Sequence, residues 1–308
     1  MNAKRFHVSV ALTTAVILGL VGSVATAAPH YSEWSAATNL GATINSSFDD
    51  SGPGLSKDGL SLYFTSTRPG FGGEDIWVSQ RASATDPWGT PVNVGATINT
   101  TAAERVPNLS RDGHWMFFGS SRAGGLGFDI WASWRPFVHD DFGWQTPVNL
   151  GSGINTTFVE NAPAFLETED GAQFIYFTSN RPGGPGDFDL YVSARQADGT
   201  WGVATPVVEL NTAFNDSRPA LRSDGLEIFF QSNRPGSAAF DLWSATRGTT
   251  TEAWSAATNL GPPNGALADI QPTISSDREL LIFSSNRSEG SGGFDLYMTT
   301  RAKQSGKP

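Results

Sequence analysis

Five acidic residues recur at one position of an internal repeat, each three residues ahead of a proline. They are Asp50, Glu104, Glu160, Asp216 and Asp269, called the ring acids below. Carboxylates in such a set could act as acids and bases on a glycosidic bond, accept hydrogen bonds from sugar hydroxyls, or coordinate a hard cation such as calcium. Which of these applies depends on how the fold arranges the carboxylates and what neutralises them.

An arginine accompanies each ring acid. The hairpins of the five copies contain Arg68, Arg122, Arg181, Arg234 and Arg287. Like charges about 4 Å apart repel by roughly 1 kcal/mol in water and about 4 kcal/mol at an intermediate dielectric, so an acidic ring needs partners or separation. One interpretation is pairing of each acid with its arginine. The other is a cation or polyol site at the mouth of a central channel.

The repeat has the length and pattern of a propeller blade. Each copy contains an Asp-Gly or Asp-Arg turn, an apolar segment, a Gly/Pro-rich hairpin, a segment that restarts on aspartate, and an element that begins with tryptophan. The tryptophans are Trp34, Trp88, Trp144, Trp201 and Trp254, spaced 53 to 57 residues apart. A period slightly above 50 with several short strands per copy is typical of β-propellers and not of helical solenoids.

We therefore predict an all-β, five-bladed propeller with four antiparallel strands per blade. The repeats lie near 53–94, 107–150, 163–210, 219–260 and 272–301. Because the mature chain begins with the Trp34 element and ends on a restart segment at Tyr297, residues 34–40 are expected to supply the outer strand of the last blade and close the ring. The Asp of each turn is expected to pair with the arginine that ends its repeat, as Asp58 with Arg81.

The repeat resembles that of a known family. The strings PxLSxDG (residues 53–59), YFTSNRPGG (176–184) and FDLYVSxR (188–195) are similar to the PD40 or TolB-like β-propeller repeat, a relative of the WD40 fold. The resemblance covers residues 31–301. It implies the propeller but no particular chemistry, because the family includes interaction scaffolds, propeller domains attached to peptidases and secreted proteins of unknown role.

The N-terminus has the layout of a cleaved secretory signal. Residues 1–27 contain Lys4-Arg5, an apolar run from Val8 to Leu20 and a small-residue end at Ala25-Thr26-Ala27. We expect a single propeller domain over 28–308 and a secreted or periplasmic location. The apolar run is shorter than the roughly 20 residues of a membrane span, and no other segment is long enough.

Composition narrows the partners. The chain has no cysteine, so neither disulfides nor thiolate metal sites are available. Without Lys4 and Arg5, 18 basic and 30 acidic residues remain, a formal charge of −12. Nucleic acid is disfavoured, because its binding depends on cationic groups that release counterions. We expect a monomer without a cofactor, with calcium at the ring acids as the alternative.

Specific function is expected where the copies differ. Just after the ring acids stand Arg105, Asn161, Arg218 and Gln271, and in the loops before them stand Phe48, Phe158 and Phe214, where the other copies have Ala102 and Leu267. Aromatic side chains beside hydrogen-bonding groups are typical of sugar or peptide sites. These residues and the ring acids form the predicted ligand site.

The preferred interpretation is a binding module or interaction scaffold for a glycan or a protein. A motif repeated five times gives its carboxylates similar surroundings, whereas a catalytic pair needs different ones. One alternative is a carbohydrate-active hydrolase or lyase using Asp50, Glu104 and Glu160, since five-bladed glycosidases place acids from successive blades in a central cavity. The other, implied by the resemblance, is an accessory protein of a TolB-like envelope complex.

Overall fold

The computed structural model describes residues 30–124 and 127–304. These residues form 22 β-strands joined by turns, and no helix occurs among them. None of this part of the chain therefore forms a helix able to cross a membrane. The predicted secretory signal lies outside the described residues.

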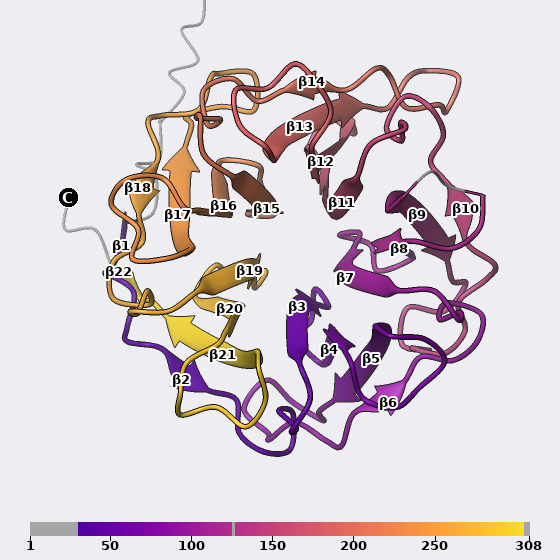
Figure 1. Ribbon diagram of the computed structural model, residues 1–308, viewed down its shortest axis with the longest axis vertical. Helices are drawn as coiled ribbons and strands as arrows, with labels where there is room; N and C mark the ends of the chain where they lie inside the picture. The colour runs from indigo at the N-terminus through magenta and orange to yellow at the C-terminus, as the bar shows by residue number, and fades with distance from the viewer. Residues whose placement is uncertain (1–29, 125–126, 305–308) are drawn as a thin grey trace, which may run out of the picture.

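Five four-stranded antiparallel sheets stand around a common centre, as Figure 1 shows. The first two blades are β3 (Asp50–Leu55), β4 (Ser61–Ser66), β5 (Asp75–Gln80), β6 (Val92–Asn93), then β7 (Glu104–Leu109), β8 (Trp115–Ser120), β9 (Asp129–Trp134), β10 (Val148–Asn149). The next two are β11 (Glu160–Glu167), β12 (Gln173–Ser179), β13 (Asp189–Ala194), β14 (Thr205–Pro206), then β15 (Asp216–Leu221), β16 (Glu227–Ser232), β17 (Asp241–Thr246), β18 (Thr258–Asn259). The predicted five-bladed all-β propeller is confirmed.

The fifth blade joins the two ends of the chain. It consists of β19 (Asp269–Ile274), β20 (Leu280–Ser285), β21 (Asp295–Thr300) and the N-terminal β2 (Thr38–Asn39). Thr38 pairs with Met298 and Asn39 with Tyr297. Beside this blade, β1 (His30–Tyr31) pairs with β22 (Lys303–Gln304). The predicted closure by the Trp34 segment is confirmed.

An asparagine side chain extends the third strand of every blade beyond its short outer partner. In the first blade, Asn99 accepts a hydrogen bond from the Ile76 N–H (2.8 Å) and donates one to the Ile76 carbonyl (2.9 Å). Asn45, Asn155, Asn211 and Asn264 do the same in the other blades. The amide thus substitutes for a strand residue: its oxygen accepts the strand N–H, and its nitrogen adds a second donor to a carbonyl that also accepts a backbone N–H, as Ile76 does from Val94 (3.2 Å).

The space between blades is filled by the apolar second strands. Phe64, Phe118, Phe177, Phe230 and Phe283 are fully buried there. The arginine that ends each repeat stacks on a tryptophan, as Arg81 does on Trp88 at 4.1 Å from the ring centroid. The predicted Asp–Arg pairing across the turn is wrong: the Arg81 Nε donates to the Gly59 carbonyl, whereas Asp58 accepts from Ser56 and the Leu60 N–H. The carboxylate closes its own turn, and the arginine bonds the backbone.

The insertion after β9 connects the first two blades. Its Asp141 is buried and accepts hydrogen bonds from Tyr63 (2.5 Å), Arg135 (2.6 Å) and Gln80 (2.7 Å). Burial, followed by the Asp141 charge, raises the pKa of the Tyr63 hydroxyl well above its usual value. This network was not foreseen from the sequence.

The joint between the chain ends yields a first prediction. Asn45→Ala removes two buried hydrogen bonds to Leu296 and should lower the free energy of unfolding by about 1–3 kcal/mol. Asn155→Ala removes the same bonds within one continuous stretch of chain and is the matched control. Hydrogen exchange should accelerate in β21 for Asn45→Ala but not for Asn155→Ala. Equal exchange of β21 in both variants would contradict the assigned role of Asn45 at the joint.

Candidate functional site

The ring acids begin the five innermost strands, but none of them faces solvent. All five are fully buried. Asp50 illustrates the pattern: it accepts hydrogen bonds from the Ser46 N–H and hydroxyl and from the Ser66 hydroxyl, and lies 3.0 Å from Arg68. Glu104, Glu160 and Asp216 have the same set with Thr in place of Ser46. An open ring of acids at the channel mouth is therefore not present.

Each ring acid is paired with the arginine of its own blade. The shortest nitrogen–oxygen distances are 3.0, 3.3, 3.0, 2.5 and 2.8 Å in chain order. The same guanidinium donates to a loop carbonyl, for example Arg122 to Ile98 (2.5 Å). The fifth blade differs, because Gly265 replaces Ser or Thr and gives Asp269 only its backbone N–H. Burial raises the pKa of Asp269, against the opposing effects of that hydrogen bond and Arg287.

A left-handed residue follows two positions after every ring acid, where the pairing of the inner strand shifts register. These residues are Gly52, Val106, Ala162, Arg218 and Gln271, with φ between 51° and 60°. In four blades the N–H of this residue bonds a side chain of the preceding blade, as Arg218 does with Thr178 (2.7 Å). Only Gly adopts this backbone at no cost, so the contacts with the preceding blade hold Val106, Arg218 and Gln271 there, whereas the Ala162 N–H bonds the Asn161 side chain of its own strand.

A cavity of about 230 Å³ lies at this end of the channel, called the acid-ring mouth. Its lining residues flank the ring acids and come mainly from the second, third and fourth blades: Arg105, Val159, Asn161, Thr178, Phe188, Asn215, Ser217, Arg218, Gln231 and Phe240. Two phenylalanine rings, several amides and two guanidinium groups thus share one small space. The structure brings together three of the residues predicted for the site, Arg105, Asn161 and Arg218.

The two arginines of the cavity are poorly neutralised. Arg105 lies 3.6 Å from Glu74 and 3.5 Å from the Phe128 ring centroid. Burial lowers the pKa of Arg105, with Glu74 opposing. Burial and then repulsion from Arg105 lower the pKa of Arg218 to about 9. Within the described chain, Arg105 Nε and Arg218 Nη1 are buried atoms without a hydrogen-bond partner.

The remaining predicted residues lie elsewhere. Gln271 is buried and accepts from the Gly52 N–H and the Ser284 hydroxyl, which connects the fifth blade to the first. Phe48, Phe158 and Phe214 are 41%, 39% and 41% exposed on the loops that enter the inner strands. They do not line the cavity.

Sequence reasoning missed the contribution of the hairpins. The residue before each restart aspartate is phenylalanine in four blades and Glu74 in the first; the phenylalanines are Phe128, Phe188, Phe240 and Phe294. The carbonyl of this residue accepts the N–H of the next blade's ring acid, as Glu74 does from Glu104 (2.8 Å). The hairpin of one blade therefore lies over the next, which brings Glu74 to Arg105. The change from Phe to Glu was the signal that could have identified it.

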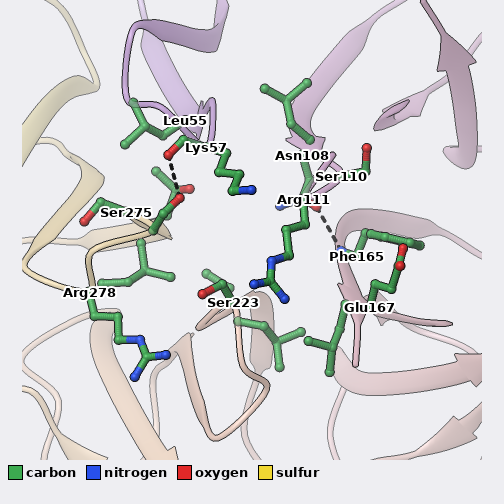
Figure 2. Close-up of a pocket in the computed structure, with 17 residues that line it drawn as sticks. Leu55, Lys57, Asn108, Ser110, Arg111, Phe165, Glu167, Ser223, Ser275 and Arg278 are labelled. Atoms are coloured by element: carbon green, nitrogen blue, oxygen red, sulfur yellow. Dashed lines mark hydrogen bonds between the residues drawn. The ribbon is translucent and has the colours of Figure 1, made fainter. Parts of the chain in front are cut away.

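A second pocket, of about 270 Å³, opens where the inner strands end. Figure 2 shows Lys57 and Arg111 extending into it, with Glu167 and Arg278 at its sides. Arg278 takes the left-handed position that glycine occupies in the other turns and lies 3.0 Å from Asp224. None of the residues predicted for the ligand site lines this pocket.

No group of three or more acidic or histidine side chains that could hold a metal ion occurs among residues 30–124 and 127–304. The calcium considered for the ring acids would have to displace an arginine from each of them. An arginine beside a buried carboxylate supplies the charge that a cation would otherwise supply.

Comparison with known proteins places this architecture among the five-bladed propellers. No protein-family model and no curated protein matches the chain. Solved structures do: a thermostable family-43 glycoside hydrolase (12% identity, 86% of this chain and 92% of that one, TM-score 0.59), an α-L-arabinofuranosidase from Lactobacillus brevis (13%, 88% and 97%, 0.60) and an arabinanase from Bacillus subtilis (14%, 85% and 96%, 0.57). At these identities the likeness establishes the fold alone.

These matches correct the preferred interpretation from the sequence. The prediction of a non-catalytic binding module or interaction scaffold is contradicted, and the hydrolase alternative agrees better with the similar solved structures. These structures are glycoside hydrolases, and the match covers nearly the whole length of each. TolB from Acinetobacter baumannii is also similar, at a TM-score of 0.47 and 54% of its chain, which is too distant to support an argument. The finer PD40 or TolB-like resemblance stays a prediction.

The burial of the ring acids yields a second prediction. Glu160→Gln keeps the side-chain volume but leaves the Arg181 charge unpaired in the interior, so the free energy of unfolding should fall by about 3–5 kcal/mol. Urea denaturation measures the change. The exposed Glu169→Gln is the control and should stay within about 0.5 kcal/mol of the wild type. A stable Glu160→Gln protein would argue against a structural role for this pair.

Proposed function

We propose that the protein is a carbohydrate-active hydrolase whose substrate binds at the acid-ring mouth. The observation that carries this proposal is the cavity beside the ring acids, where phenylalanine rings lie next to amide and guanidinium donors. Apolar ring faces and convergent hydrogen-bonding groups are what a sugar requires. The shared fold with glycoside hydrolases supports the same conclusion.

The catalytic carboxylates would not be the ring acids, because these are buried and paired with arginine. Glycoside hydrolysis normally uses two carboxyl groups that flank the scissile bond. Glu74 and Asp49 are the accessible acids that we assign to this role. Glu74 lies 3.6 Å from Arg105, and Asp49, directly before the ring acid of the first blade, accepts the Phe294 N–H (2.9 Å). Their surroundings differ, as an acid and a base require.

We also propose that the protein is exported and that it descends from a propeller repeat. The N-terminal signal pattern supports export, where a polysaccharide substrate would be met. The PD40-like strings support descent from a propeller repeat that has been adapted to different chemistry.

Turnover tests the proposal directly. The mature protein should release reducing ends from at least one of arabinan, arabinoxylan and polygalacturonate. Glu74→Gln and Asp49→Asn should each lower this rate by about 10²- to 10⁴-fold. Glu169→Gln, exposed outside the cavity, should have no effect. If the wild-type protein cleaves none of these polymers, or if both rim variants keep full activity, the hydrolase assignment fails.

A further inference from the structure

We propose that Arg105 and Arg218 bind the carboxylate of an acidic sugar, so that the ligand of the acid-ring mouth is a uronate-containing glycan. This inference rests on the proposed function and narrows its substrate class. It is built on three features of the cavity: its charge, its unsatisfied donors and the residue type at position 218.

The charge at the cavity lacks a counterpart. Every hairpin arginine at this end has a ring acid of its own, at 2.5 to 3.3 Å. Arg105 and Arg218 instead line one cavity, and within the described chain the ion pair of Arg105 with Glu74 is the one that either of them makes. The Glu74 contact is long at 3.6 Å, and the side chain of Glu74 is 30% exposed. Such an ion pair contributes little, so one more anion is needed to balance the pair.

Each of the two arginines has an unsatisfied hydrogen-bond donor. Arg105 Nε and Arg218 Nη1 are buried within the described structure and make no hydrogen bond. A buried charged donor without a partner is costly, and a carboxylate that accepted from both would remove that cost. The planar guanidinium fork matches a carboxylate through two parallel hydrogen bonds.

The propeller fold does not require an arginine at position 218. The equivalent residues are Gly52, Val106, Ala162 and Gln271, and all of them complete the same inner-strand geometry. Arg218 accepts a left-handed backbone, with φ of 60°, that glycine would adopt freely. Its side chain lines the cavity, and its Nη1 has no hydrogen-bond partner within the described structure.

The size and the other walls of the cavity fit one sugar ring. About 230 Å³ is below the roughly 300–1000 Å³ of drug-sized pockets. Phe188 and Phe240 offer apolar faces, and Gln231 lines the same space. Asn161 uses its Oδ1 to accept the Ala162 N–H, which leaves its Nδ2, unpartnered in the described structure, as a donor for a hydroxyl.

Binding of matched ligands tests the inference without requiring turnover. Trigalacturonate and its methyl ester have the same ring and differ in charge, and both can be titrated by calorimetry at neutral pH. The acid should bind at least about tenfold more tightly than the ester. Arg218→Gln and Arg105→Ser should each reduce this preference to less than about threefold.

The variants are chosen so that folding is preserved. Gln271 is the equivalent of Arg218 in the fifth blade. Ser51 and Ser217 are the equivalents of Arg105 in the first and fourth blades. Thermal unfolding confirms that each variant folds. Arg111→Gln removes a guanidinium from the pocket at the opposite end and should leave the preference unchanged. Arg218→Lys keeps the charge without the fork and should keep part of the preference.

The outcomes separate this inference from the hydrolase proposal. Equal binding of acid and ester, or a preference that survives Arg218→Gln, overturns the inference even if a neutral polysaccharide is cleaved. An arginine-dependent preference without cleavage of any polymer supports the inference and refutes the hydrolase. Tighter binding of a sulfated oligosaccharide than of trigalacturonate would overturn the assignment to uronates.

Discussion

The buried carboxylate–arginine pair at the start of each inner strand is the contact on which the rest of this propeller depends. In the first blade, Asp50 joins the loop that enters the strand, the end of the second strand and the hairpin arginine. Buried ion pairs add little net stability, but breaking one leaves a charge that the interior cannot accommodate. The five pairs therefore define where the loops lie more than they stabilise the fold. The acid-ring mouth is built on those loops.

The fold could be predicted from the sequence alone because several independent features of the repeat indicate it. The period, the strands apolar on both faces and the unequal chain ends all indicated one ring closed by the N-terminal segment, as the pairing of Thr38 with Met298 confirms. The restart aspartate Asp75 closes its hairpin by accepting hydrogen bonds from the Phe71 and Gly72 N–H groups. The partners of the turn aspartates were not foreseen. The turn contains both a carboxylate and a backbone carbonyl as possible acceptors; Arg81 binds the Gly59 carbonyl, and Asp58 accepts from Ser56 instead.

The candidate site was only partly predictable. Arg105, Asn161 and Arg218 were found because they interrupt the repeat, and repeats change where selection acts on one copy. The solvent exposure of the ring acids was misjudged, because the serine and threonine hydroxyls that enclose them, such as Ser66 and Thr156, look like ordinary strand and loop residues. Glu74 was overlooked as a site residue because its approach to Arg105 depends on a hairpin of one blade lying over the next.

The noncovalent joint in the fifth blade has a consequence for biosynthesis. Asn45 and Leu296 are 251 positions apart, and β2 is made long before its partner β21. Four blades can assemble in order as the chain emerges, whereas the earliest segment must wait, unpaired, until the last strand has been made. During this delay the chain carries an unpaired strand that chaperones could bind. The propeller can close only once its last strand has been made.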